Sequence, residues 1–149
     1  MKNNIFTTKL YEIIFHENEN FDSIFLVMNY LKTDMKKMSS SKNLNFSENH
    51  MKVIFYNLLC SINYIHSANV MHRDLKPANI LVGTYGEVII CDFGLARTLP
   101  KECCNRSLSR HVQTRWYRSP EVILGNRDYD NKVDMWSIGC ILGELVCLS

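Results

Sequence analysis

The segment 70–93 most limits what this chain can fold into. It reads VMHRDLKPANILVGTYGEVIICDF, in which short apolar runs alternate with charged residues and turn residues. The runs VMH, NILV and EVIICDF predict small strands, and Gly83 and Gly86 predict a tight hairpin between the last two. Asp74 follows the first run, and Asp92 lies near the end of the last.

Two further strands are predicted near the start of the chain, from KLYEIIF (9–15) and SIFLVMNYL (23–31). Both are rich in β-branched and aromatic residues, and the polar segment HENENFD between them predicts a turn. The next segment, KTDMKKMSSSKN, is polar and predicts a linker with at most a short helix.

Two longer helices are predicted further along the chain. Ser47 is a suitable N-cap for the first, although no acidic residue stands at the capping-box position. The second, NKVDMWSIGCILGELVCLS, would begin at Asp130 or Asn131 and is apolar on nearly every face, so we expect it to be buried. The apolar stripe that predicts the first helix consists of Met51, Ile54, Phe55, Leu58, Ile62 and Ile65.

Length and charge exclude some classes of protein. The 149 residues predict one domain, and a net charge of +2 gives no argument for binding nucleic acid or a membrane surface. No apolar run has the length of a signal peptide or a membrane span. The six cysteines contain no CxxC pair and mostly lie in apolar runs, as free thiols do. We therefore expect a reduced intracellular location, in the cytoplasm, the nucleus or both.

Three motifs, HRDLKPANILV, CDFG and SPE, occur in this order along the chain. Their conjunction resembles the protein kinase superfamily. The resemblance implies an α+β, protein-kinase-like fold that is incomplete, with the end of the small lobe and the first half of the mainly helical large lobe. Residues 1–31 would supply small-lobe strands and the hinge, and residues 32–149 a large-lobe portion with catalytic loop, activation segment and the start of a buried helix.

The resemblance assigns roles that suit phosphoryl transfer from ATP, a reaction that depends on positioning and on neutralising phosphate charge. Asp74 would orient a substrate hydroxyl and accept its proton, and Lys76 would face the transferring phosphate. Asn79 and Asp92 would bind Mg²⁺, a hard cation that prefers oxygen ligands. The alternative is that Asp74 and Asp92 are ordinary turn and cap residues.

Three other residues are expected to support these loops. By the same resemblance, the buried Asp134 would hold the backbone of the catalytic loop. His72 and Phe93 would pack so that the loops keep their register.

The stretches ICDFGLAR, TRWYRSPEVIL and YDNKVDMWSIGCILGEL resemble the branch that holds mitogen-activated and cyclin-dependent protein kinases. In that branch the Trp-Tyr-Arg stretch shapes the pocket for the substrate residue after the acceptor, usually proline. Thr114 would hydrogen-bond toward Asp74 and Lys76, and Arg118 would restrict the pocket. Substrates would then be Ser-Pro or Thr-Pro sites on proteins.

The stretch MNYLKTDMKKM resembles the hinge of mitogen-activated protein kinases. On that match Met28 is the gatekeeper, and Asn29 to Leu31 offer backbone groups to adenine. Asp34 would lie near the ribose, and Leu81 would also belong to the nucleotide site.

Two elements of a full kinase are not matched in this sequence. No G-x-G-x-x-G occurs, and Lys9 is not the strand lysine, because the strand LYEIIF follows it without room for a helix. We expect this chain, expressed alone, to be marginally stable and unable to phosphorylate substrates. The alternative to a Ser/Thr kinase fragment is a catalytically inactive, truncated kinase-like interaction protein.

The segment 97–118 predicts a site of regulation. Its many basic residues are opposed by Glu102 alone, and Arg73 would add to them if the loop folds back. A phosphate could order such a cluster by pairing with arginines. The basic residues are Arg97, Lys101, Arg106, Arg110, Arg115 and Arg118.

The activating Thr-x-Tyr pair of mitogen-activated protein kinases falls here on Ser109, Arg110 and His111. Serine can still take a phosphate, whereas histidine cannot become phosphotyrosine. We therefore expect one regulatory site, Ser109, with Arg73, Arg97 and Arg118 as receivers and an upstream kinase as partner. The alternative is a solvated basic loop that is never modified.

Overall fold

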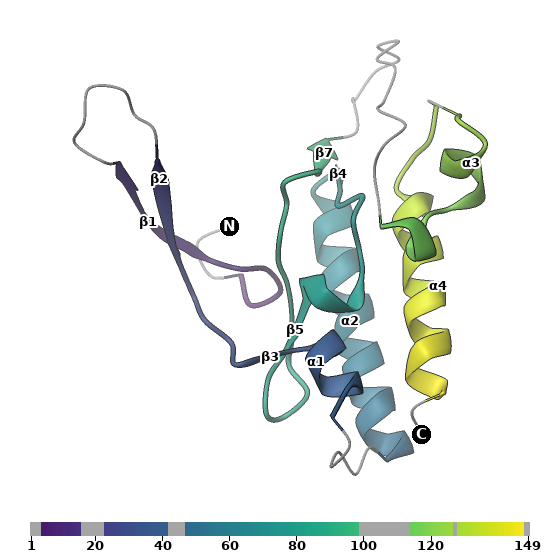
Figure 1. Cartoon of the computed structure of the whole chain (residues 1–149), viewed down its shortest axis with the longest axis horizontal. Coiled ribbons are helices and arrows are strands. Elements are labelled where there is room, and N and C mark those ends of the chain that lie inside the picture. Colours follow the sequence, from purple (N-terminus) through teal and green to yellow (C-terminus); the bar gives the residue numbers. More distant parts are fainter. Residues whose placement is uncertain (1–3, 16–22, 42–46, 99–113, 127, 148–149) are drawn as a thin grey trace.

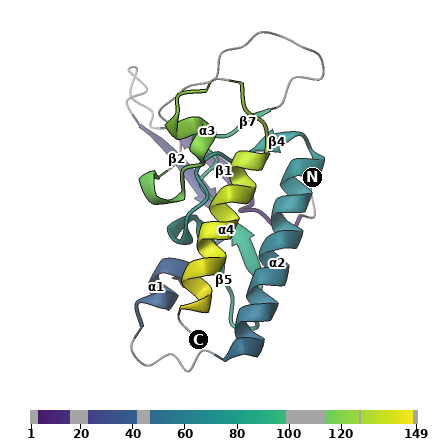
Figure 2. The same cartoon turned by 90° about the vertical axis from the view of Figure 1, so that its right-hand side faces the viewer.

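The computed structural model describes residues 4–15, 23–41, 47–98, 114–126 and 128–147. Two helices, α2 (Glu48–Ser67) and α4 (Lys132–Val146), lie side by side in both views (Figures 1 and 2). A hairpin of β1 (Leu10–Phe15) and β2 (Ile24–Met28) projects away from them (Figure 1). The short strands and turns between these two parts carry the predicted site.

The β1–β2 hairpin confirms the two strands predicted near the start of the chain. The strands pair antiparallel, with Ile14 opposite Phe25, and the register shifts after Leu10. Every residue of both strands is exposed, although nearly all are apolar. The turn predicted at residues 16–22 lies outside the described part of the chain.

Side chains at their N-termini fix the starts of α1 and α2. The short helix expected in the linker is α1 (Met35–Ser39), and Asp34 caps it by accepting a hydrogen bond from the Lys37 backbone N at 2.8 Å. At α2, Ser47 Oγ accepts from the His50 backbone N, and the Ser47 backbone N donates to His50 Nδ1, both at 3.4 Å. A capping box is therefore present at a position where the sequence indicated none, because an imidazole nitrogen replaces the carboxylate.

A small antiparallel sheet in the order β3-β5-β6 packs against α2. Its strands are β3 (Thr33–Asp34), β5 (Ile80–Val82) and β6 (Val88–Ile90). The predicted hairpin is confirmed: the Gly83 N–H donates to Glu87 O at 2.9 Å, and Gly86 has a φ of +83°, which favours glycine.

The edge strand β6 also contacts the start of the chain. Ile90 N donates to Phe6 O at 2.9 Å, and Thr8 N donates to Ile90 O at 3.0 Å. The sequence did not indicate this contact between distant segments. The strand ends at Ile90, earlier than expected, and Asp92 then takes a φ of 63°, which is outside the strand region.

Several short elements lie between α2 and α4 in the sequence, in addition to β5 and β6. Strand β4 (Val70–Met71) pairs antiparallel with β7 (Arg97–Thr98), and the 3₁₀ turns η1 (Pro77–Asn79) and η2 (Arg115–Tyr117) precede helix α3 (Pro120–Ile123).

Helix α4 begins after Asn131, and Asp130 accepts a hydrogen bond from the Lys132 backbone N at 2.9 Å. The expectation that α4 is buried on nearly every face is wrong in part, because Met135 and Trp136 are 44% and 49% exposed.

Most of the apolar stripe of α2 is buried against the sheet and α4, while Met51 and Phe55 are half-buried. Leu58 is fully buried, and Ser61 closes the same face by donating to Asn57 O and Val88 O. A second, smaller cluster consists of Met71, Val122, Tyr129 and Val133. In the described part of the chain, none of the helices combines the length and the apolar character that crossing a membrane requires.

Candidate active site

The loop that follows β4 is held by one carboxylate from α4. Asp134 is fully buried; its Oδ1 accepts from the Arg73 backbone N at 2.8 Å, and its Oδ2 accepts from the His72 backbone N at 2.9 Å. His66 of α2 lies 2.8 Å from the same Oδ2 through its Nε2. Burying a carboxylate is costly unless hydrogen-bond donors surround it, so these donors must converge when the chain folds. The contact expected between Asp134 and the loop backbone is present.

Arg73 and Asp92 both have left-handed backbones, with φ values of 68° and 63°. Such a conformation costs a residue other than glycine about 1–3 kcal/mol and persists where surrounding contacts enforce it. Arg73 directly precedes Asp74, and Asp92 is itself one of the chemistry-bearing positions that the sequence singled out.

The Asp74 carboxylate lies at the centre of the site and is 7% exposed. Its Oδ2 accepts from Lys76 Nζ at 2.7 Å. Its Oδ1 accepts from the backbone N and the Oγ1 of Thr114, at 2.8 and 3.0 Å. Thr114 and Lys76 therefore bind opposite oxygens of one carboxylate, although positions 76 and 114 are 38 apart in the sequence.

Asn79 joins this loop to the residue before Asp92. Its Nδ2 donates to Asp74 O at 2.9 Å, and its own backbone O accepts from the Cys91 backbone N at 3.0 Å. Asp92 is exposed, and its Oδ1 accepts from the Gly94 backbone N at 3.3 Å. The chain therefore brings an amide and a carboxylate from separate loops to neighbouring positions.

His72 and Phe93 pack as expected. Their rings meet edge to face with centroids 5.0 Å apart, and His72 Nε2 lies 3.0 Å from Cys91 O. Burial lowers the pKa of His72 below its ordinary value. A neutral ring with the proton on Nε2 can donate to Cys91 O and accept from the Asp74 backbone N, which lies 3.2 Å from Nδ1.

The donor set of Asn79 and Asp92 fits Mg²⁺. That ion prefers oxygen ligands, keeps several waters, and is commonly held by one or two protein side chains together with substrate phosphates. Among the described residues there is no group of three or more His, Cys, Asp or Glu side chains that could hold a metal ion.

The residues expected to contact a nucleotide lie along the path from β2 to β5. Met28 ends β2 and is 48% exposed, and Asn29 receives a hydrogen bond from the Lys9 backbone N at 2.7 Å. Leu31 is half-buried. Asp34 pairs with Leu81 across β3 and β5, which places both next to the turn that carries Asn79.

The residues expected to receive a phosphate have different surroundings. Arg73 is 1% exposed, and its guanidinium donates to Leu95 O and Tyr129 Oη. Arg97 is exposed, and Arg118 is half-buried. Ser109 lies outside the described residues, as do Arg110 and His111.

A brace that the sequence did not indicate joins η2 to α4. Tyr117 Oη donates to Glu144 Oε1 at 2.6 Å, and Ser137 Oγ donates to Tyr117 O at 2.8 Å. Ser137 and Glu144 are seven positions apart and so share one helix face, which was the only signal available in the sequence. Because Tyr117 N also donates to Thr114 O at 3.0 Å, the brace fixes the segment that contacts Asp74.

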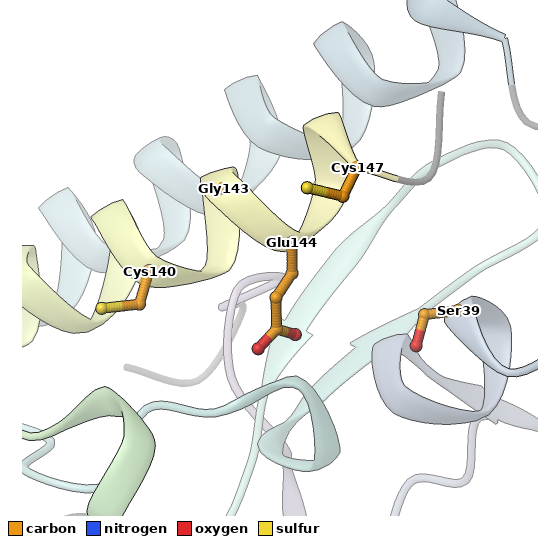
Figure 3. Close-up of a pocket in the computed structure, with 5 residues that line it drawn as sticks. All are labelled: Ser39, Cys140, Gly143, Glu144 and Cys147. Carbon is orange, nitrogen blue, oxygen red and sulfur yellow. The ribbon is translucent and has the colours of Figure 1, made fainter.

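Glu144 also lines a shallow pocket between α1 and α4, together with Ser39, Cys140, Gly143 and Cys147. Its carboxylate projects from α4 into the space that faces the helix of Ser39 (Figure 3). Burial is the main cause that raises the pKa of the Cys140 thiol. The Cys140 thiol is therefore a weak nucleophile.

The chain was compared with protein families and with curated proteins, and both comparisons found similar proteins. The family model described as "Protein kinase domain" matches residues 4–149. "Mitogen-activated protein kinase 15" of Xenopus laevis is 44% identical over 141 residues, which are 93% of this chain and 24% of that protein. "Extracellular signal-regulated kinase 2" of Dictyostelium discoideum is 44% identical over 142 residues, 93% of this chain and 37% of that protein. The chain thus spans between 24% and 37% of the length of these curated relatives.

A solved structure supports the fold. A chain from the crystal structure of the yeast RNA Pol II CTD kinase CTDK-1 complex matches with a TM-score of 0.86 and 32% identity. The match covers 99% of this chain and 46% of that one. The expected α+β fold, covering part of a larger kinase fold, is confirmed.

The Tyr117–Glu144 contact generates a pH prediction. Burial and the hydrogen bond to Glu144 raise the pKa of Tyr117 above its ordinary value. The folded chain therefore holds this proton more tightly than the unfolded chain, whose tyrosines titrate near about pH 10. The resulting stability is complete below about pH 10 and is lost as the pH rises further.

In urea denaturation, we expect the free energy of unfolding to fall more steeply above about pH 10 in the unchanged protein than in Tyr117→Phe. Tyr85→Phe is the control, because Tyr85 is 86% exposed, and it should follow the unchanged protein. Equal pH dependence in the unchanged protein and Tyr117→Phe would contradict the account.

Proposed function

Because the chain belongs to the protein kinase family, we propose that the protein carrying it transfers the γ-phosphoryl group of ATP to serine or threonine hydroxyls of protein substrates. The observation that supports this most is the Asp74 carboxylate, held by Thr114 on one oxygen and by Lys76 on the other. A carboxylate fixed in this way suits a group that must meet a hydroxyl in one orientation.

Asp74 would accept the proton of the attacking hydroxyl. Its charge is held in place by donors on both oxygens, so little reorganisation is needed when the hydroxyl arrives. Lys76 lies 2.7 Å from Asp74 and is partly exposed, which allows its ammonium group to approach the transferring phosphate as well. Positioning and charge neutralisation of this kind provide most of the catalysis in phosphoryl transfer.

Asn79 and Asp92 would hold Mg²⁺, which neutralises phosphate charge when it is bound. The Nδ2 of Asn79 is occupied by Asp74 O, which directs the amide oxygen away from that carbonyl and makes it the side available to a cation. Phe93, the residue after Asp92, packs on His72, and this contact would hold the backbone of Asp92 next to the loop of Asp74.

The adenine and ribose would lie along Met28, Asn29, Leu31, Asp34 and Leu81. The pairing of Asp34 with Leu81 supports this, because it brings the end of the predicted hinge beside the loop of Asn79. Asp34 also caps α1, so a ribose would share its carboxylate with the Lys37 backbone N.

Substrates with Ser-Pro or Thr-Pro sites are the proposed class. The segment from Thr114 to Arg118 would form the pocket for the proline, and it is fixed at one end by Asp74 and at the other by α4. Trp116 within it is 82% exposed, which makes it available to a partner.

The proposed location is the cytoplasm or the nucleus. Cys60, Cys91, Cys140 and Cys147 are free thiols in the described part of the chain, which agrees with a reducing compartment.

Kinase assays on the natural protein that carries this chain test the proposal. Asp74→Asn should lower kcat by about 10²–10⁴-fold, the usual contribution of a general base. Asp92→Asn should lower kcat and raise the Mg²⁺ concentration that gives half-maximal activity, because a neutral amide replaces a carboxylate ligand. A Ser-Pro peptide should be preferred over its Ser-Ala counterpart by about tenfold in kcat/KM.

Asp128→Asn is the matched control for these variants, because Asp128 is an exposed aspartate outside the site. It should leave kcat unchanged. A protein that binds partner proteins but transfers no phosphate with any peptide would support the inactive interaction protein instead.

We also propose that phosphorylation of Ser109 by an upstream kinase increases activity, with Arg73, Arg97 and Arg118 as candidate receivers. The support is the charge of the segment 97–118, where Glu102 is the only acidic residue. Ser109→Ala in the natural protein should remove activation by an upstream kinase while Ser107→Ala, the neighbouring control, should keep it. Equal activation of both variants would refute the role of Ser109.

A further inference from the structure

The Arg73 side chain connects three segments of the site. It is 1% exposed, and its Nε donates to Leu95 O at 2.8 Å, in the turn after Asp92. Its Nη1 donates to Tyr129 Oη at 2.8 Å, in the segment before α4. Its backbone N donates to Asp134, so the chain from Tyr129 to Asp134 holds Arg73 through both side chain and backbone.

The ring of Tyr129 is fixed independently of its hydroxyl. It is 7% exposed and packs in the second cluster, with Met71, Val122 and Val133. Met71 lies two positions before Arg73, so the cluster includes a residue at the start of the loop. Removing the hydroxyl would leave this packing in place and withdraw the acceptor from Arg73.

The contact matters because Arg73 is strained. Its φ of 68° is a left-handed conformation that surrounding contacts must enforce. A buried guanidinium that loses an acceptor is also penalised, which favours movement of the side chain and its backbone. The next residue is Asp74, so such movement would displace the carboxylate that Thr114 and Lys76 hold.

We propose that Tyr129 is a positioning residue: its hydroxyl, acting through Arg73, keeps Asp74 in the orientation needed for phosphoryl transfer. This inference rests on the proposed kinase function. Because the hydroxyl is a neutral acceptor within the fold, it holds Arg73 without any phosphate on the loop.

The test is a double-mutant cycle in the natural protein that carries this chain. Tyr129→Phe should lower kcat about tenfold while KM for ATP changes by less than about twofold, since one hydrogen bond is lost and no nucleotide contact is touched. Adding Tyr129→Phe to Arg73→Met should change kcat by less than about twofold, because the hydroxyl then has no guanidinium to hold. Additive losses of kcat, or an unchanged kcat in Tyr129→Phe, would overturn the inference.

Val122→Ala separates positioning from packing. It loosens the same cluster, in which Val122 is 2% exposed, but leaves the Tyr129 hydroxyl in place. It should lower the melting temperature and keep kcat within about twofold of the unchanged protein. All assays are made at a temperature where circular dichroism shows every variant folded. A loss of kcat in Val122→Ala as large as in Tyr129→Phe would assign Tyr129 a packing role only and overturn the inference.

The two proposals fail in different ways. If the unchanged protein transfers no phosphate, the proposed function fails. If the unchanged protein transfers phosphate and Tyr129→Phe has the same kcat, only the role proposed for Tyr129 fails.

Discussion

The buried carboxylate of Asp134 is the interaction on which the rest of the site depends. It is fully buried on α4 and accepts hydrogen bonds from two successive backbone amides, those of His72 and Arg73, while His66 of α2 contacts one of its oxygens. A carboxylate in this position is tolerated only when its donors are in place. The two long helices and the loop between the strands must therefore come together in one arrangement, and that arrangement sets the backbone immediately before Asp74.

Two strained backbone positions and a set of hydrogen bonds then arrange the side chains of the site around the loop that Asp134 holds. Arg73 and Asp92 take left-handed backbones, and Thr114, brought from a distant part of the sequence, closes on Asp74. The Tyr117–Glu144 contact holds Thr114 from the side of α4. Preorganised charge of this kind is what phosphoryl transfer requires of a protein, because the reaction asks for positioning more than for covalent chemistry.

The spacing of apolar residues and the positions of turn-forming residues predicted much of the fold. The stripe of α2, the Gly83–Gly86 hairpin and the strands β1 and β2 follow from such local signals. The histidine capping box was missed because the rule names an acidic or amide side chain.

The motifs also placed Asp74, Lys76 and Asn79 in one loop, and the structure brings Thr114 to them. The contacts of Tyr117 with Glu144 and of Arg73 with Tyr129 could not be predicted, because each joins side chains far apart in sequence whose meeting depends on how α4 packs. The exposed faces of Met135 and Trp136 were missed for a related reason, since apolar composition alone does not say which face of a helix finds a partner.

Amide hydrogen exchange in Asp134→Asn tests the central claim most directly. The substitution keeps the size of the side chain but turns one acceptor oxygen into a donor, which then faces the backbone N–H of His72 or of Arg73 unfavourably. The account predicts that exchange of the His72 and Arg73 amides accelerates by at least about tenfold, while Asp130→Asn, a change at a partly exposed aspartate in the segment before α4, leaves both rates unchanged. Unchanged protection of the two amides in Asp134→Asn would contradict the claim that this carboxylate holds the loop.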